Sequence, residues 1–431
     1  MITKTVGKTP TRPLKVCVIG GGSTYTPELI DGFIGLGRSL PVEEVALMDV
    51  DPARLETLGA MARRMVAAAH GETAVRTTSD RLDALRDADY VVTQIRVGGT
   101  KARIQDERIP LKYGVIGQET TGPGGFANAL RTVPVMLDIA ADTARVAPRA
   151  RLINFTNPSG IVTEALAKHS EIEPIGLCNG PIGAQRAIAG LLDTEPERIR
   201  MDWVGLNHLS WVRGVMLDGR EIIGDVIERA ISSGLVGQFS PALLRGLGML
   251  PSYYLDYYYN TNRVLSEQRA AERTRGEEVH EIERRLLDSY ADPGLVTKPA
   301  ELGKRGGAYY STAAVSLIRA LEGEDGIHIV NVPNCGAIAE LPGNVAVEVP
   351  CSVENGTVRR LPCSPLPATI RGLVQSVKSY EELTIQASVE GDEVAAVLAL
   401  NAHPLVPSFD VAEKIWEDIK RIHARYLPQF A

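Results

Sequence analysis

The chain has 431 residues and a formal net charge of −7, with 44% hydrophobic and 23% charged residues. This length predicts two or three lobes. The acidic balance gives no support to nucleic-acid binding, so we expect no nucleic-acid partner. No run approaches the ~20 apolar residues of a membrane helix and no apolar signal segment is present, so we expect no membrane partner and a cytoplasmic location. The five scattered cysteines argue against a disulfide framework.

After a flexible leader, expected over residues 1–13, a strand pattern runs directly into a glycine turn. Residues 14–19 (LKVCVI) are typical of a buried strand, 20–27 (GGGSTYTP) of a turn and 28–34 of a helix. This succession is the context of a dinucleotide site, although Tyr25 replaces the third glycine of the usual fingerprint. Backbone N–H groups at such a turn can bind a pyrophosphate. The candidate cofactor-binding residues are Gly20, Gly21, Gly22, Ser23 and Thr24.

The next predicted strand, residues 44–49, ends in Asp49. A carboxylate at this point of a dinucleotide fold accepts the ribose hydroxyls and favours NAD over NADP, because it repels a 2′-phosphate. The alternative is a turn residue before the helix start at Asp51 and Pro52.

Two further strand patterns end in polar residues. Residues 89–95 lead to Arg96, and residues 151–155 lead to Asn157. Alternating strands and helices predict an α/β, Rossmann-like, doubly wound parallel sheet, whose ligands bind at the carboxyl ends of the strands. Arg96 could hold an anion or be a solvated charge. Asn157 could bind a sugar hydroxyl or only begin an Asn-Pro turn.

The segment 110–133 is rich in glycine and hydroxyl residues. It predicts either a long solvated loop or a lid that contacts the cofactor, because long irregular loops in α/β domains are commonly functional.

Cys178 and His208 each lie in a short apolar run ended by glycine. A thiolate with an imidazole suits a divalent transition metal, and two protein ligands would leave an open, catalytic coordination sphere. The alternative is a small buried cysteine and a satisfied core histidine.

Several motifs occur in one order along the chain. They are GGGSTYTPEL, MDVD, QIRVGG, KYGVIGQETTGPGGF, NFTNPSG, GLCNGPIG and GLNHLSW, followed by PSYYLDYY, KRGGAYYST and IHIVN. Together they resemble the NAD- and divalent-metal-dependent family 4 glycoside hydrolases, and most closely their 6-phospho-β-glucosidase members. The resemblance begins near residue 14 and covers most of the chain.

This resemblance implies hydrolysis of 6-phospho-β-glucosides by redox elimination rather than by paired carboxylates. Bound NAD takes a hydride from C3, a base removes the C2 proton, the aglycone leaves, water adds and the hydride returns. A metal on the C2 and C3 oxygens stabilises the charge, and manganese is the expected ion. The alternatives are an NAD-dependent sugar or hydroxy-acid dehydrogenase, or a family 4 enzyme for another or a non-phosphorylated glycoside.

The resemblance also assigns roles to individual residues. Cys178 and His208 match the metal ligands, and Tyr254 matches the C2 base, with a metal and cationic groups expected to lower its pKa. The residues that match contacts to the phosphorylated glycoside are Arg96, Asn157, Asn179 and Arg275. Tyr254 has tyrosine neighbours, so an aromatic core face is its alternative.

We predict an NAD-binding domain over residues 14–200 and a second, α+β substrate and oligomerisation domain over 201–431. The family resemblance implies a homodimer or homotetramer.

Overall fold

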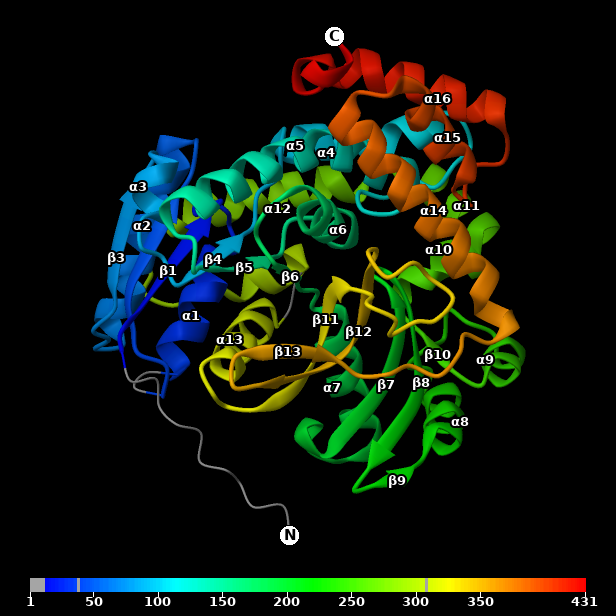
Figure 1. Ribbon diagram of the computed structural model, residues 1–431, viewed down its shortest axis with the longest axis horizontal. Helices are drawn as coiled ribbons and strands as arrows, with labels where there is room; N and C mark the ends of the chain where they lie inside the picture. Colours follow the sequence, from blue (N-terminus) through cyan, green and yellow to red (C-terminus); the bar gives the residue numbers. More distant parts are fainter. Residues whose placement is uncertain (1–11, 37–38, 307–308) are drawn as a thin grey trace.

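The computed structural model describes residues 12–36, 39–306 and 309–431 (Figure 1). The predicted leader, residues 1–13, lies largely outside these described residues. A nine-stranded sheet forms the centre of the described chain, in the order β13-β12-β11-β6-β5-β4-β1-β2-β3. Its strands are β1 (Leu14–Ile19), β2 (Val42–Met48), β3 (Ala74–Thr78), β4 (Tyr90–Thr93), β5 (Arg151–Asn154), β6 (Pro174–Gly176), β11 (Gly326–Pro333), β12 (Ala346–Glu354) and β13 (Thr357–Arg360).

The half of the sheet formed by β1 to β6 is parallel and has the order 3-2-1-4-5-6, which is that of a doubly wound dinucleotide fold. The Rossmann-like prediction is therefore confirmed. From β6 onward β11, β12 and β13 extend the same sheet in antiparallel pairing. The sheet is thus mixed, and it contains strands from both sides of residue 200.

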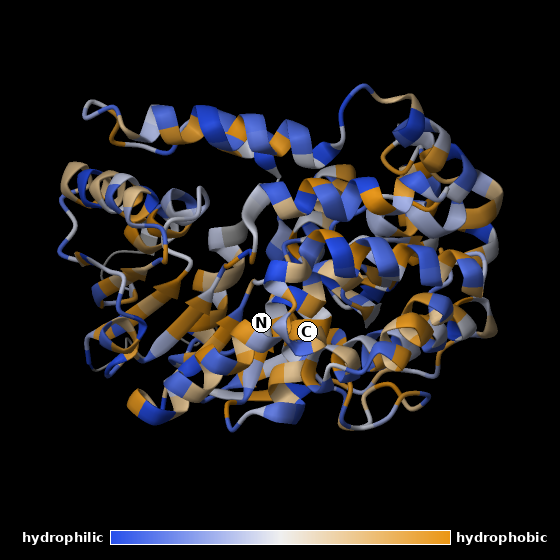
Figure 2. Cartoon of the chain, turned by 90° about the horizontal axis from the view of Figure 1, so that it is seen from above, coloured by the Kyte–Doolittle hydropathy of each residue, from blue (hydrophilic) through white to orange (hydrophobic). Residues whose placement is uncertain are grey.

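Apolar strands account for the core of this sheet. All four residues of β4 are buried, as are five of the six in β1. Strands this apolar require cover on both faces, which parallel sheets obtain from crossover helices. The helices that follow the parallel strands are α1 (Thr26–Leu36), α2 (Pro52–Ala68), α3 (Arg81–Leu85), α4 (Gly99–Lys112), α5 (Gly122–Val146), α6 (Ser159–His169) and α7 (Gly180–Leu192). In Figure 2 the strands are largely hydrophobic, whereas the helices alternate between hydrophobic and hydrophilic residues, as half-buried helices do.

A second, smaller sheet has the order β10-β8-β7, and β9 pairs with β8. Its strands are β7 (Ile199–Leu206), β8 (Leu209–Leu217), β9 (Arg220–Glu221) and β10 (Leu250–Pro251). β7 packs on β12 of the large sheet, so the two sheets share one core. Figure 1 shows the hairpin β7–β8 beside α7 and below the C-terminal helices.

The remaining helices lie around these sheets. They are α8 (Ile223–Ser233), α9 (Pro241–Leu247), α10 (Asp256–Tyr259), α11 (Thr261–Ala270), α12 (Arg275–Tyr290), α13 (Tyr310–Leu321), α14 (Ala368–Glu390), α15 (Glu393–Ala402) and α16 (Phe409–His423). Helices α14 and α15 pack on α5, and α16 packs on α4. The second half of the chain therefore covers part of the first half.

The segment 110–133 is not the long loop that was predicted. Helix α4 continues to Lys112 and α5 begins at Gly122, so the connection spans only residues 113–121. Pro123 lies in the first turn of α5, where a missing N–H costs nothing, and every residue from Gly122 to Val133 is buried. Tertiary burial therefore outweighs the low helix propensity of this glycine-rich sequence.

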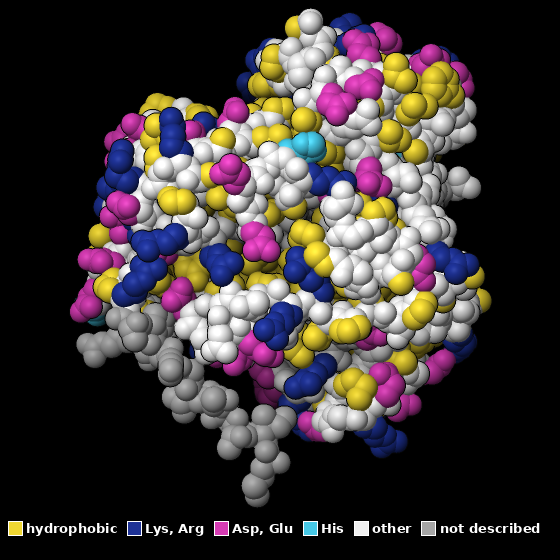
Figure 3. Space-filling model, in the orientation of Figure 1, with side chains coloured by type: hydrophobic (Ala, Val, Ile, Leu, Met, Phe, Trp, Pro, Cys, Tyr) yellow, Lys and Arg dark blue, Asp and Glu magenta, His cyan; other side chains and the backbone are white. Residues whose placement is uncertain are grey.

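Among the described helices, none combines the length and apolar character that a membrane span needs. On the face shown in Figure 3, Lys and Arg side chains are interspersed with Asp and Glu side chains.

Candidate active site

The glycine turn after β1 packs tightly against the next strand. Gly20 has φ +93°, and a Cβ there would come within 2.9 Å of the Gln94 backbone. A Cβ on Gly22 would come within 2.8 Å of Asp49 Oδ2, which already accepts a hydrogen bond from the Gly22 N–H at 2.8 Å. A side chain at either position would collide with these atoms, so the turn requires glycine at both.

The structure brings together the six residues predicted to bind the cofactor. Ser23 and Thr24 complete the turn, and the buried hydroxyl of Thr24 has no hydrogen-bond partner among the described residues. Arg54 was missed by the sequence analysis. Its Nε donates to the Gly22 carbonyl at 2.9 Å, so it buttresses the turn from α2. The basic residue Arg54 in the first turn of the helix after Asp49 was the feature of the sequence that could have indicated this contact.

Cys178 and His208 both line one cavity, of about 280 Å³, together with Asn179 and Tyr254. Cys178 follows β6, where the chain enters α7, and the Gly180 N–H donates to its Sγ at 3.4 Å. His208 occupies the tip of the β7–β8 hairpin with φ +61°, a left-handed conformation that is uncommon outside glycine.

The ring of His208 is fixed from two sides. Its Nδ1 lies 2.9 Å from Thr120 Oγ1, and its ring stacks on that of Tyr254 with centroids 3.7 Å apart and planes 15° apart. Burial lowers the pKa of His208 to about 3, so the imidazole is neutral at physiological pH. A neutral, oriented imidazole is the form that binds metal ions.

Tyr254 lies in the short turn Tyr253–Leu255 that follows β10. Burial, and then Tyr253 and Cys178, raise the pKa of Tyr254 well above its ordinary value. The groups that act most strongly on this pKa are acidic, so its lowering by a metal and cationic groups stays a prediction. The tyrosine neighbours belong to the turn Tyr253–Leu255 and to α10, and the thiol is that of Cys178.

Glu348 lines the cavity, and the sequence analysis assigned it no role. This buried β12 carboxylate accepts four hydrogen bonds of 2.9–3.1 Å from Trp203 Nε1, Asn207 Nδ2, Ser210 Oγ and Asn331 Nδ2. Asn207 precedes His208, so Glu348 fixes the hairpin that carries the imidazole. Burial, and then Glu348, raise the pKa of the Cys178 thiol to about 12. A lone Glu in the apolar strand pattern VAVEV was the available signal.

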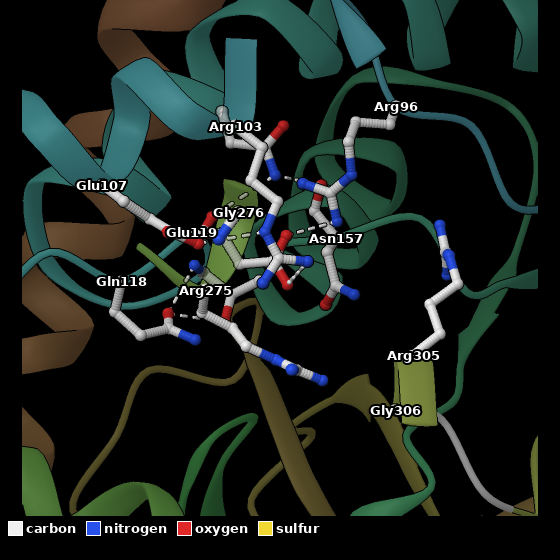
Figure 4. A network of polar contacts seen from close by, with 12 residues as sticks. Arg96, Arg103, Glu107, Gln118, Glu119, Asn157, Arg275, Gly276, Arg305 and Gly306 are labelled. Carbon is white, nitrogen blue, oxygen red and sulfur yellow. Dashed lines mark hydrogen bonds and ion pairs between the residues drawn. The ribbon is translucent and has the colours of Figure 1, made fainter. Parts of the chain in front are cut away.

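A second group of charged residues surrounds Glu119. Arg96 forms an ion pair with Glu119, and Arg103 Nη1 lies 2.8 Å from the other oxygen of the same carboxylate. Arg103 also binds Glu107, which accepts the Gly276 N–H at 2.6 Å. Figure 4 shows Arg96, Arg103 and Arg275 around this group, with Asn157 beside them and Arg305 at its edge.

The arginines of this group retain unused donor capacity. Arg96 Nη1 and Arg305 Nε are buried and have no hydrogen-bond partner among the described residues. Arg275 is half-exposed, and one of its nitrogens donates to the Lys304 carbonyl at 2.7 Å. Unpartnered guanidinium nitrogens favour binding of an anion such as phosphate.

The connection 113–121 joins the arginine group to the cavity. Glu119 contacts Arg96 and Arg103, whereas the next residue, Thr120, contacts His208. Glu119 also raises the pKa of His208 slightly against the larger effect of burial. Arg103, Glu119 and Arg305 were not among the predicted site residues, although all three lie in or near quoted motifs, because their mutual ion pairing depends on tertiary contact.

The N-terminal family model described as family 4 glycosyl hydrolase matches residues 15–194, and the model of the family's C-terminal domain matches residues 203–406. This chain belongs to glycosyl hydrolase family 4. The two matches meet close to residue 200, and the domain division predicted there stays a prediction.

Named relatives of this family 4 chain are similar over almost their whole length. A probable 6-phospho-β-glucosidase of Bacillus subtilis (strain 168) is 44% identical over 97% of this chain and 98% of its own length. The 6-phospho-β-glucosidase of Escherichia coli (strain K12) is 38% identical, with 97% of each chain covered. A crystal structure of the Thermotoga maritima 6-phospho-β-glucosidase with manganese, NAD⁺ and glucose-6-phosphate superimposes with a TM-score of 0.89 at 36% identity, covering 96% of this chain and 99% of that one.

The described residues fit both cofactors that family 4 implies. The glycine turn has glycines where a Cβ would collide with neighbouring protein atoms, an unpartnered Thr24 hydroxyl and a carboxylate at Asp49, and these features fit a dinucleotide. Cys178 Sγ and the His208 imidazole are donors for a divalent transition metal. Among the described residues, no set of three or more His, Cys, Asp or Glu side chains could hold a metal, so such an ion would have coordination positions left for substrate.

Proposed function

We propose that this chain hydrolyses 6-phospho-β-glucosides with NAD and a divalent metal ion, manganese being the expected one. The observation that carries the proposal is the meeting of Cys178, His208 and Tyr254 in one cavity, joined by a single short connection to arginines with unpartnered nitrogens. The crystal structure of the Thermotoga maritima relative contains manganese, NAD⁺ and glucose-6-phosphate, which supports the same set of ligands here.

The residues would divide the work as follows. Arg96, Arg275 and Asn157 hold the phosphorylated sugar, and Asn179 binds a sugar hydroxyl. Tyr254 accepts the proton from C2 of the sugar, so its phenol must be ionised when the substrate is bound. When bound, NAD supplies a hydride acceptor and the metal ion supplies a Lewis acid for the C2 and C3 oxygens.

The electrostatics of the cavity explain why a cation is needed. Cys178, Tyr254 and Glu348 are acidic groups whose burial raises their pKa, and the groups that act most strongly on Tyr254 are other acidic ones. A divalent ion at Cys178 and His208 would lower the pKa of the nearby phenol, because an opposite charge within a few ångströms favours the ionised form. Tyr254 could then serve as a base near neutral pH.

The test is release of p-nitrophenol from its 6-phospho-β-glucoside in the presence of NAD⁺, Mn²⁺ and a thiol reductant. We expect release that stops with EDTA and returns with added Mn²⁺, without net accumulation of NADH. The unphosphorylated β-glucoside and the 6-phospho-α-glucoside are the matched controls and should react far more slowly. No release, or release unaffected by EDTA, would refute the proposal. Steady NADH accumulation would instead identify a dehydrogenase.

A further inference from the structure

The cavity has two chemically different sides. Cys178, His208 and Tyr254 carry its polar side, where the proposed chemistry takes place. Another part of the lining is one face of α7, where the lining residues Gly180, Gly183, Ala184 and Ala187 recur at helical spacing. The side chains on this face are small, and they leave room for the cavity beside α7.

Neither glycine is required by the fold. Gly180 and Gly183 do not have positive φ angles. A Cβ on Gly183 would meet nothing within 4 Å, and one on Gly180 would meet only Cys178 Sγ at 3.5 Å. Glycine inside a helix lowers stability relative to alanine. The chain therefore keeps open space here at a cost in stability, which indicates that the space is occupied by something other than the protein.

A further part of the cavity lining is largely apolar. It includes Leu235 and Val236, which follow α8, together with Val212 and Leu250 of the small sheet. Leu235 is 43% exposed, although large aliphatic side chains are usually buried. In this part of the lining Gln238 and Ser252 add polar side chains, and the buried Ser252 Oγ has no hydrogen-bond partner among the described residues. We call the space bounded by α7 and these residues the slot, and most of its lining is apolar.

We propose that this slot binds the aglycone and selects an apolar ring, such as a benzyl or aryl group, over a second sugar. This inference rests on the proposed function. The aglycone is attached at C1, the carbon next to the C2 whose proton Tyr254 accepts, so it begins beside Tyr254 and extends into the same cavity. A sugar there would lose water from its hydroxyls without finding enough hydrogen-bond partners on these walls, whereas a ring would gain from leaving water.

The first test compares three substrates: benzyl 6-phospho-β-glucoside, methyl 6-phospho-β-glucoside and cellobiose 6′-phosphate, with the phosphate on the non-reducing sugar. All three release an alcohol, so their rates report aglycone binding rather than the acidity of a phenol. We expect kcat/KM for the benzyl glycoside to exceed that of the other two by about tenfold or more. Equal or faster reaction of cellobiose 6′-phosphate would overturn the inference while leaving the proposed function intact. No reaction of any substrate would refute the proposed function itself.

The second test fills the slot from α7. Gly183→Leu places a side chain in the space, whereas Gly190→Leu makes the same change on an exposed position of the same helix that does not line the cavity. We expect Gly183→Leu to lower the benzyl-to-methyl ratio of kcat/KM by about tenfold, mainly through KM, and Gly190→Leu to leave the ratio unchanged. Thermal unfolding of both variants checks that they fold. An unchanged ratio in folded Gly183→Leu would overturn the inference.

Discussion

The tyrosine hydroxyls near the cavity differ in their surroundings, although their residues are neighbours in the sequence. Tyr254 stacks on His208, whereas the hydroxyl of Tyr258 lies 3.2 Å from His403 Nε2, away from the cavity-lining residues. Tyr253 is 54% exposed. The sequence alone could not show which of these tyrosines faces the cavity. Consecutive residues of a turn and a short helix point to different sides, so neighbouring tyrosines have different surroundings. The stacking contact with a predicted metal ligand favours Tyr254.

Replacement of Tyr254 by Phe removes the hydroxyl and retains the ring that stacks on His208. We expect kcat to fall by about 10²- to 10⁴-fold, because a positioned base contributes that much to proton transfer. Exchange of the sugar C2 hydrogen with solvent deuterium should be lost in parallel. Tyr258→Phe is the matched control and should retain both glycoside hydrolysis and C2 hydrogen exchange. If Tyr254→Phe retained C2 exchange, another residue would have to be the base.

Predictions from the chemistry of single side chains located the cavity. Cys178 and His208 were predicted as a pair, and the structure places both in one cavity. Glu348 received no role because its function is to accept hydrogen bonds from residues on four other segments, which are β7, the β7–β8 turn, β8 and β11. A buried carboxylate with four donors is a property of the tertiary fold, and no spacing in the sequence reports it.

At the scale of elements, the turn between β1 and α1 was predicted from its strand, glycine run and helix. The structure adds the reason why the glycines matter, which is the closeness of Leu47 on β2 and of Asp49 just after it. It also shows that the connection 113–121 is short and tied to His208, where the sequence predicted a long loop or lid. Helix propensity did not predict the start of α5, because burial of this helix compensates for the low helix propensity of its glycines.

Gly22→Ala tests the glycine turn. The new Cβ would come within 2.8 Å of Asp49 Oδ2 and 3.1 Å of Arg54 Cβ, so it would displace the carboxylate expected to bind ribose. We expect the Kd for NAD⁺ to rise about tenfold or more, a loss of ~1.4 kcal/mol or more. Isothermal titration calorimetry measures this directly. Gly35→Ala, on α1 and with open space around its Cβ, is the control. Equal affinity of the two variants would show that this turn does not contact the cofactor.

At the scale of the whole molecule, a buried cluster of Asp106, Arg131 and His423 joins α4 and α5 to the C-terminal helix α16. Arg131 of α5 donates two hydrogen bonds of 2.7 and 2.8 Å to Asp106 of α4, and both side chains are fully buried. His423 of α16 lies 3.1 Å from the same carboxylate. Burial alone would raise the pKa of Asp106, but Arg131 and His423 outweigh it and lower the pKa. The C-terminal helix α16 is thus fixed to α4, which carries Arg103.

Asp106→Asn leaves the guanidinium of Arg131 buried without its counter-charge. We expect the free energy of unfolding to fall by ~3–5 kcal/mol, the usual cost of breaking a buried pair. The pKa of Asp106 is lower in the folded state than in the unfolded state. The ionised carboxylate therefore adds to the free energy of unfolding above the unfolded pKa of about 4, and this stabilisation is lost as pH falls. Urea denaturation should show a difference between wild type and variant that is full at pH 7 and shrinks as pH falls below about 4. Glu228→Gln, which breaks the exposed pair with Arg245, should change little at either pH. A similarly small loss in Asp106→Asn would contradict this account.

By itself the sequence determined the doubly wound half of the sheet, the glycine turn with its acidic partner and the Cys-His pair. Strand hydrophobicity and turn chemistry are local properties, and the order of the motifs identified the family. Only the tertiary structure decided that β11, β12 and β13 extend the first sheet, that Arg103, Glu119 and Arg305 join Arg96, and that Glu348 fixes the hairpin of His208. These features depend on contacts between residues that are far apart in the chain, and such contacts form only when the whole core packs.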